Sequence, residues 1–333
     1  PQQYKQLLMV SGFDKYFQIA PCFRDEDARA DRSPGEFYQL DFEMSFATQE
    51  DIFRIGEEVL TETFKKFAPE GSFVTEAPYP VISYKQAMLE FGSDKPDLRN
   101  PLRIIDLTDF FQRCTFKPFH NKTVRGIKVH AEMSMGFHEK LLKYATSIGM
   151  GGLGYLEVLE DKSYKGPIDK FIPEDMKGEI ADIAGLEAGD TIFFIADKEE
   201  FANNFAGQLR NELGKRLDLI EKNAYRFCFV NDFPMYEYDK EEKKIIFTHN
   251  PFSMPQGGLQ ALNEKDPLDI LAYQYDIVCN GVELSSGAVR NHDLDIMVKA
   301  FEIAGYSEED LKAKFGALYN AFQFGAPPHA GMA

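Results

Sequence analysis

Apolar and polar residues alternate from position 37 to position 46, with the two-residue period of a β-strand. The apolar side, which we expect to pack on a core, carries Tyr38, Leu40, Phe42 and Met44. The polar side carries Gln39, Asp41 and Glu43. Residues 16–20 predict a shorter strand just before it. One face of this region is therefore expected to be buried and the other to carry polar groups.

Capping signals and apolar stripes predict helices further along the chain. Thr48 can cap a helix, with Asp51 three residues on as in a capping box. The stripe that follows it is Ile52, Ile55, Val59, Leu60 and Phe64. Ser307 can cap another helix, whose stripe is Leu311, Phe315, Leu318 and Phe322. A further helix is expected near residues 205–217.

The local composition of the chain changes between residues 78 and 101, where prolines and turn-forming residues are frequent. Residues 100–222 mix short expected strands (124–129, 155–159 and 191–196) with helices. Residues 223–333 become rich in strands again. We therefore expect an α+β protein in three segments: 1–99 and 223–333 form one domain, and 100–222 is an α+β domain inserted into it.

Composition narrows the class of protein. The formal net charge of −17 over 333 residues argues against nonspecific coating of nucleic acid, which depends on neutralising phosphates. Three arginines nevertheless lie within nine residues: Arg24, Arg29 and Arg32. The four cysteines are far apart and predict buried free thiols. With no apolar run of membrane-spanning length and no signal peptide, we expect a cytoplasmic protein that does not enter membranes.

The polar and charged side chains that could form a functional site lie around residues 24–43. Arg24 and Glu26 would share one face of a strand, and the polar side of residues 37–46 would share another. If the two strands pair, they form a polar floor on one sheet surface. Buried charges of both signs are costly unless they are paired or bound to a ligand. The alternative is a solvated sheet face with surface ion pairs.

The segment "FRDED-x-R-x-DR…EF-x-QLD-x-E" resembles motif 2 of class II aminoacyl-tRNA synthetases in its aspartyl form. The segments "PQQYKQLLMVSGFDKYFQIAPCFRDE", "GSDKPDLRNP", "HNPFSMP", "NGVELSSGAVRNH" and "GAPPHAGMA" follow that family's order. The chain is thus similar to a bacterial-type aspartyl-tRNA synthetase core: an antiparallel sheet flanked by helices, with a GAD-type insert. Three departures are Gly35, one residue more than the shorter bacterial form, Asn250 in place of a second histidine, and an end before the motif 3 arginine.

The resemblance implies roles position by position. Aspartate binding is implied for Gln2, Lys5, Arg24, Gln39, Asp41, His249 and Arg290. ATP binding is implied for Arg24, Asp25, Glu26, Ser33, Phe37 and Glu283. Metal binding is implied for Asp276 and Glu283, and a catalytic role for Arg24 and Glu283. Such a site activates an amino acid by positioning and charge stabilisation, without a nucleophilic side chain.

The function implied is that of an aspartate–tRNA ligase. It uses ATP and Mg²⁺, takes L-aspartate and tRNA as substrates, and works as a homodimer when full length. The family's anticodon-binding barrel, motif 1 and motif 3 arginine lie outside residues 1–333, so this fragment alone is expected to be inactive. Alternatives are a synthetase for asparagine or lysine, a paralogue that does not charge tRNA, and a noncatalytic binding module.

Overall fold

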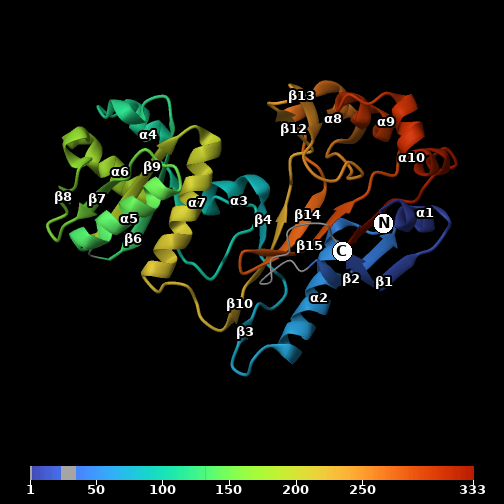
Figure 1. The fold of residues 1–333 in the computed structure, drawn as a ribbon, viewed down its shortest axis with the longest axis horizontal. Helices are drawn as coiled ribbons and strands as arrows, with labels where there is room; N and C mark the ends of the chain where they lie inside the picture. The colour runs from blue at the N-terminus through green and yellow to red at the C-terminus, as the bar shows by residue number, and fades with distance from the viewer. Residues whose placement is uncertain (1, 24–34, 132) are drawn as a thin grey trace. The chain divides into compact units, whose positions relative to one another are not determined.

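The computed structural model describes residues 2–23, 35–131 and 133–333 of the chain. They form two compact units, labelled by element in Figure 1. Unit 1 comprises residues 1–84 and 225–333, and unit 2 comprises residues 85–224. The chain therefore leaves unit 1 once and returns to it. Unit 2 begins earlier than the predicted position 100.

A mainly antiparallel sheet is the centre of unit 1. In spatial order its described strands are β1 (Lys15–Phe23), β2 (Glu36–Ser45), β16 (His329–Met332), β15 (Val282–Val289), β14 (Gln274–Cys279), β11 (Phe227–Asn231) and β4 (Val81–Ser83). The pair of β11 and β4 is parallel, and the other neighbours are antiparallel. Together with the flanking helices, this confirms the predicted α+β class.

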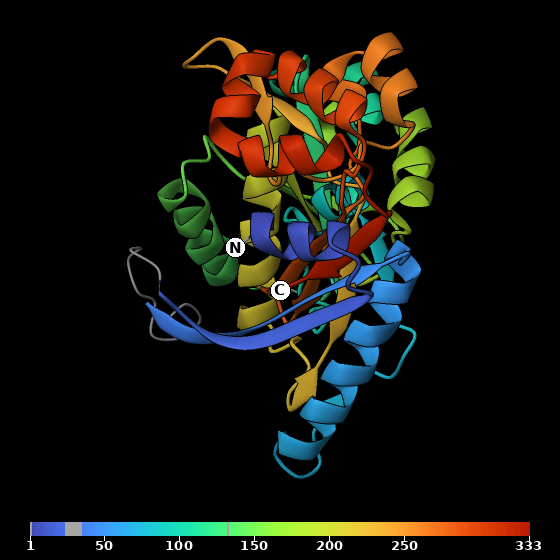
Figure 2. The same ribbon diagram turned by 90° about the vertical axis from the view of Figure 1, so that its right-hand side faces the viewer.

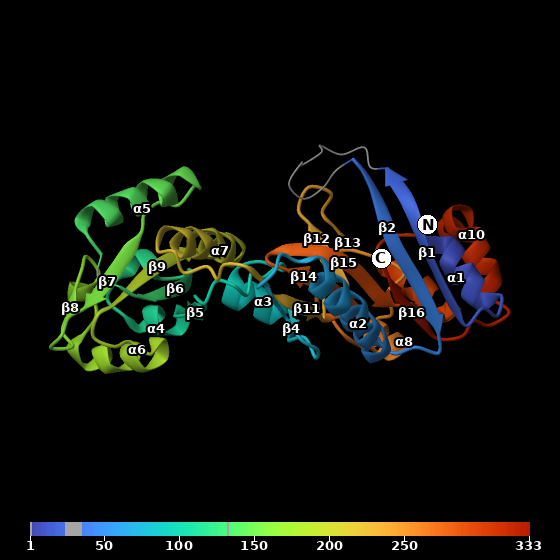
Figure 3. The same cartoon turned by 90° about the horizontal axis from the view of Figure 1, so that it is seen from below.

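The register of the sheet decides which side chains share a face. Gln18 of β1 lies opposite Asp41 of β2, and Gly331 of β16 lies opposite Glu43. Because opposite residues of paired strands point to the same side, the polar side of β2 continues across β16 to Ala288 of β15. Figure 3 shows β1, β2 and β16 side by side. This continuous surface is called the polar face below.

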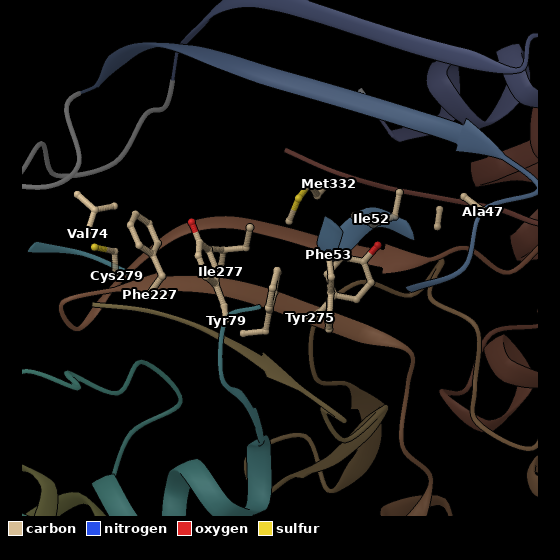
Figure 4. Close-up of a cluster of buried hydrophobic side chains, with 12 residues drawn as sticks. Ala47, Ile52, Phe53, Val74, Tyr79, Phe227, Tyr275, Ile277, Cys279 and Met332 are labelled. Atoms are coloured by element: carbon tan, nitrogen blue, oxygen red, sulfur yellow. The ribbon is translucent and has the colours of Figure 1, made fainter. Parts of the chain in front are cut away.

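The other face of the sheet packs on α2 (Gln49–Phe67), which starts with the predicted capping box of Thr48 and Asp51. Phe53 of α2 stacks on Phe229 of β11, with ring centroids 3.8 Å apart. Figure 4 shows this core, which also takes side chains from β14 and β16. The shared cluster is Ala47, Ile52, Phe53, Val74, Tyr79, Phe227, Phe229, Tyr275, Ile277, Cys279, Ala330 and Met332.

The apolar side of β2 corrects one expectation. Phe42 and Met44 pack against the core, as predicted. Tyr38 and Leu40, however, are 72% and 39% exposed. The described part of α2 packs on β11, β14 and β16, so the outer half of the β1–β2 hairpin is not covered by it. Alternation identified the strand correctly but could not show how far the core extends along it.

Helices also lie on the polar face, where α1 (Gln2–Val10) sits beside α9 (Leu294–Ile303) and α10 (Glu308–Phe322). Figure 2 shows α1 and these helices on the same side of the β1–β2 hairpin. An apolar cluster joins them, including Leu7 and Val10 of α1. The other elements of unit 1 are β3 (Phe73–Val74), β10 (Ala224–Tyr225), β12 (Tyr236–Asp239), β13 (Lys244–Phe247), α8 (Gly258–Glu264) and η4 (Pro267–Asp269).

Unit 2 is built on a second antiparallel sheet. Its described strands are, in spatial order, β5 (Ile104–Asp106), β6 (Thr123–His130), β9 (Asp190–Asp197), β7 (Gly154–Val158) and β8 (Tyr164–Lys165). The helices are α4 (Thr108–Arg113), α5 (Met135–Ser147), α6 (Lys177–Ala184) and α7 (Glu199–Arg216), with α3 (Tyr84–Phe91) at the boundary and the short η1 (Lys117–Phe119), η2 (Asp169–Phe171) and η3 (Glu174–Met176). Two apolar clusters give this unit a core of its own.

The segment "GSDKPDLRNP" is fixed to α7 by one buried arginine. Arg210 Nε donates to the carbonyl of Leu102 at 2.7 Å, and Nη2 donates to the carbonyls of Asp97 and Asn100 at 2.9 and 2.8 Å. Burial lowers the pKa of Arg210 to about 10, which leaves it charged at neutral pH. The clamp explains why this turn-rich segment is ordered within unit 2.

Candidate active site

Four buried charges meet at the centre of the polar face. Lys5 Nζ of α1 lies 2.7 Å from Asp41 Oδ1 and 3.4 Å from Glu43 Oε2. Arg290 donates from Nε to Glu43 Oε1 at 2.8 Å and from Nη2 to Glu43 Oε2 at 3.2 Å. Glu43 therefore links Lys5, near one end of the chain, to Arg290, which lies 247 residues after Glu43 in the sequence. The described site is an ionic network and not a solvated sheet face.

The network keeps its charges although water is excluded. Burial alone would raise the pKa of Glu43, but the adjacent Arg290, with Lys5 and His329, outweighs burial and lowers that pKa. Conversely, burial would lower the pKa of Arg290, and the contact with Glu43 raises it. Two cations face two carboxylates, so the cluster as a whole is close to neutral. Such a balance allows each charge to stay ionised inside the fold.

Gly331 makes room for the carboxylate of Glu43. A Cβ at this position would lie 2.1 Å from Glu43 Oε2 and 2.2 Å from the carbonyl oxygen of Phe42. No side chain fits there, because β16 runs directly alongside β2. The glycine of "PPHAG" is thus a structural requirement of the network.

A hydrogen-bonded chain of three side chains lies beside the network. Gln2 Nε2 donates to Gln6 Oε1 at 3.1 Å, and Gln6 Nε2 lies 3.2 Å from His329 Nε2. His329 Nδ1 lies 2.8 Å from the carbonyl oxygen of Pro327. Gln6 and His329 are both completely buried. The sequence singled out Gln2 but neither Gln6 nor His329, whose contact spans 323 residues.

The residues expected to bind metal lie on the next strands of the same face. Asp276 of β14 is opposite Ser286, and Glu283 of β15 is opposite Val278. A register shift between Ile277 and Val278 brings Asp276 and Glu283 to one side of the sheet. Asp276 is 4% exposed, and Glu283 is open to solvent.

These two carboxylates suit a Mg²⁺ ion that is bound partly by the protein and partly by water and a substrate. Within the described residues, no group of three or more His, Cys, Asp or Glu side chains could hold a metal. Mg²⁺ often takes one or two protein carboxylates and completes its shell with water and substrate phosphates. A pair of acids on one sheet face suits that mode of binding, and a metal held by protein alone does not fit.

The remaining predicted residues fall into three groups. Gln39 and Phe37 lie on the polar face, where Cys22 Sγ lies opposite Phe37 and 3.7 Å from Gln39 Oε1. His249 is exposed, with its ring edge-on to Phe233 at 5.1 Å. Four of the predicted residues lie outside the part of the chain that the structure describes: Arg24, Asp25, Glu26 and Ser33.

The network can hold a ligand that carries charges of both signs. Lys5 and Arg290 offer cationic donors for carboxylates, and the planar guanidinium suits a carboxylate in particular. Asp41 and the amide oxygen of Gln2 can accept hydrogen bonds from an ammonium group. An amino acid with an acidic side chain combines these features. Among the described residues, no helix is long and apolar enough to cross a membrane.

The chain matches one protein family and several known proteins. The family described as tRNA synthetases class II (D, K and N) matches residues 1–333. Proteins named aspartate--tRNA(Asp/Asn) ligase from Ehrlichia canis (strain Jake) and Gluconobacter oxydans (strain 621H) are each 56% identical over 340 residues, covering 100% of this chain and 57% of theirs. An aspartyl tRNA synthetase structure from Entamoeba histolytica matches with a TM-score of 0.44 at 16% identity, covering 100% of this chain and 45% of that one. The chain thus spans little more than half of the curated relatives.

Proposed function

Because the chain belongs to the class II tRNA synthetases (D, K and N), we propose that it carries the amino-acid-activating site of an aspartate–tRNA ligase. The observation that carries the proposal is the buried network of Lys5, Glu43 and Arg290. Two buried cations suit an acidic side chain. A lysine substrate would bring a third cation to the same place, and asparagine would offer the donors of Lys5 and Arg290 a neutral amide instead of a carboxylate. The names of the relatives agree with aspartate.

In the proposed reaction the α-carboxylate of aspartate attacks the α-phosphorus of ATP. A new oxygen–phosphorus bond forms and pyrophosphate leaves, giving aspartyl-adenylate. Arg290 reaches the side-chain carboxylate through Nη1, since its Nε and Nη2 bind Glu43. Lys5 adds a second positive charge beside it, and Asp41 and Gln2 take the ammonium group. The site thus fixes the attacking carboxylate, which is how positioning lowers a bimolecular barrier.

ATP is proposed to lie along the polar face towards β14 and β15. The ring of Phe37 would stack on adenine, and Arg24, Asp25, Glu26 and Ser33 would complete the site as the resemblance implies. Asp276 and Glu283 would hold Mg²⁺, which neutralises phosphate charge when it is bound. Transfer of aspartate to tRNA, possible use of tRNA for asparagine, a homodimer and a cytoplasmic location belong to the same proposal. A noncatalytic module is not favoured, because a binding surface needs no such costly buried network.

The test is aspartate-dependent exchange of labelled pyrophosphate into ATP, measured with the full-length protein. Lys5→Met and Arg290→Met should each lower exchange at least 100-fold at fixed aspartate. Lys65→Met, which removes an exposed lysine paired with Glu76, is the matched control and should not change it. Exchange that depends on asparagine or lysine and not on aspartate would overturn the substrate assignment.

A further inference from the structure

The chain from Gln2 through Gln6 to His329 has a fixed direction. A carbonyl oxygen only accepts, so His329 Nδ1, 2.8 Å from the oxygen of Pro327, carries a hydrogen. In a neutral imidazole the other nitrogen, Nε2, is then an acceptor. Gln6 must turn its amide nitrogen to it, at 3.2 Å, and its oxygen to Gln2. Gln2 must in turn donate from Nε2, at 3.1 Å.

We propose that His329 is a positioning residue that sets the amide orientation of Gln2 through Gln6, so that Gln2 presents its oxygen to the α-ammonium group of the bound amino acid. The proposal deepens the proposed function and rests on it. Gln2 stands at the start of α1, one turn before Lys5, so both lie at the same end of the network. Its Nε2 is engaged by Gln6, which leaves Oε1 to accept from a ligand.

Burial makes the orientation rigid. Gln6 and His329 have no exposed surface, so water cannot replace a broken bond between these two side chains. Reversing the Gln6 amide alone would place two donors against each other at one end and two acceptors at the other. The hydrogen on His329 therefore fixes the direction of the buried Gln6 amide, and Gln2 keeps its bond to Gln6 only when it donates from Nε2.

Protonation of His329 would reverse the chain. Nε2 would become a donor, Gln6 would turn its oxygen to it, and Gln2 would turn its amide hydrogens towards the ligand ammonium. The titratable and charged groups that face His329 are Glu43 on β2, and Arg290 and His292 just after β15, with Lys5 of α1 on the far side of Glu43. Burial, partly opposed by the Pro327 contact and by Glu43, lowers the pKa of His329, so the neutral form is present at neutral pH.

The experiment compares two ligands that differ in the ammonium group. L-aspartate is assayed as the substrate of pyrophosphate exchange by the full-length protein. Succinate, which lacks the ammonium group, is assayed as a competitive inhibitor of the same reaction. His329→Leu should raise the KM for aspartate about tenfold, with the succinate inhibition constant and the KM for ATP within twofold of wild type. His329→Gln can still accept from Gln6 and should restore most of the aspartate affinity. Gln6→Met breaks the same chain without altering the sheet and should match His329→Leu.

Two further readouts separate positioning from loss of folding. In a Gln2→Met background, His329→Leu should have no additional effect, because the orientation it sets no longer matters. Because burial lowers the pKa of His329 below the ordinary histidine value of about 6.5, the wild-type KM for aspartate should stay level from pH 8 to below pH 6.5 and rise only in the more acidic part of a range down to pH 5. His329→Gln should abolish that rise. Equal losses for aspartate and succinate, or additive effects with Gln2→Met, would overturn the relay. Absence of aspartate-dependent exchange in the wild type would instead overturn the proposed function itself.

Discussion

Glu43 remains ionised without any contact with water, because Arg290 and Lys5 surround its carboxylate. The resemblance to the synthetase family implied a common site for Lys5, Asp41 and Arg290, and the structure brings these three side chains together around Glu43. The alternation of residues 37–46 placed Glu43 on the same polar face as Asp41, but it could not predict the contact of Glu43 with Arg290, since that contact depends on the order of β2, β16 and β15. The sequence indicated neither Gln6 nor His329 for the same reason, because their contact joins distant parts of the chain and no local sequence pattern marks it.

Removing Arg290 should therefore be costly to stability as well as to substrate binding. Arg290→Met leaves Glu43 buried without its main partner, and we expect a loss of about 3–5 kcal/mol in the free energy of unfolding. Urea denaturation measures it. Arg54→Met is the control, because that exposed arginine pairs with Asp51 on the surface and should contribute under about 0.5 kcal/mol. Similar losses in the two variants would show that the Glu43 pair is not a buried ion pair.

Cys22 gives an independent probe of the polar face. It is half-buried opposite Phe37, whereas the other three cysteines are buried and burial raises the pKa of Cys114 to about 11. Iodoacetamide near pH 8 should therefore modify Cys22 first, and ATP should slow the reaction if adenine stacks on Phe37. Peptide mass spectrometry follows the modification, with Cys22→Ser as the control. Equal rates with and without ATP would contradict an adenine site at Phe37.

At the scale of the elements, the sequence predicted most strands and helices but not their neighbours. The capping signals at Thr48 and Ser307 correctly start α2 and α10, and the predicted strands 124–129 and 191–196 lie within β6 and β9. The register shift between Ile277 and Val278, where β14 pairs with β15, had no signal in the sequence. Which strands adjoin depends on long-range packing, so the insertion of β16 between β2 and β15 had no local signal.

Because β16 lies between these strands, a small change in it should affect the site. Gly331→Ala places a Cβ where the Glu43 carboxylate and the Phe42 carbonyl already are, so we expect a loss of about 3 kcal/mol or more in unfolding free energy. Aspartate-dependent exchange should fall with it. The matched control is Gly316→Ala in α10, where no atom lies within 4 Å of the new Cβ and stability should rise slightly. Chemical denaturation measures the free energy of unfolding of both variants. A Gly331→Ala variant as stable as the wild type would contradict the packing of β16 on Glu43.

At the scale of the whole chain, unit 2 has its own sheet and its own apolar clusters. We predict that residues 85–224 fold in isolation with a cooperative urea transition and a dispersed NMR spectrum. Within that fragment, Arg210→Met should cost about 3 kcal/mol, since it leaves two buried carbonyls and one half-buried carbonyl without their charged donor. Lys222→Met, at an exposed surface pair, should cost almost nothing. A fragment without a cooperative transition would show that unit 2 depends on unit 1.

The distance along the chain between Gln6 and His329 has a consequence for synthesis on the ribosome. Translation at roughly 5–20 residues per second puts about 16–65 seconds between the emergence of these two residues, which are 323 positions apart. During that interval unit 2 can finish folding, whereas β2 has neither β16 beside it nor Arg290 to neutralise Glu43. Residues 1–84 of the nascent chain therefore stay incompletely folded during this interval, and their β1–β2 hairpin exposes several aromatic side chains. This is the period in which trigger-factor-type chaperones would have most to shield, and slowing translation after residue 224 should lengthen it.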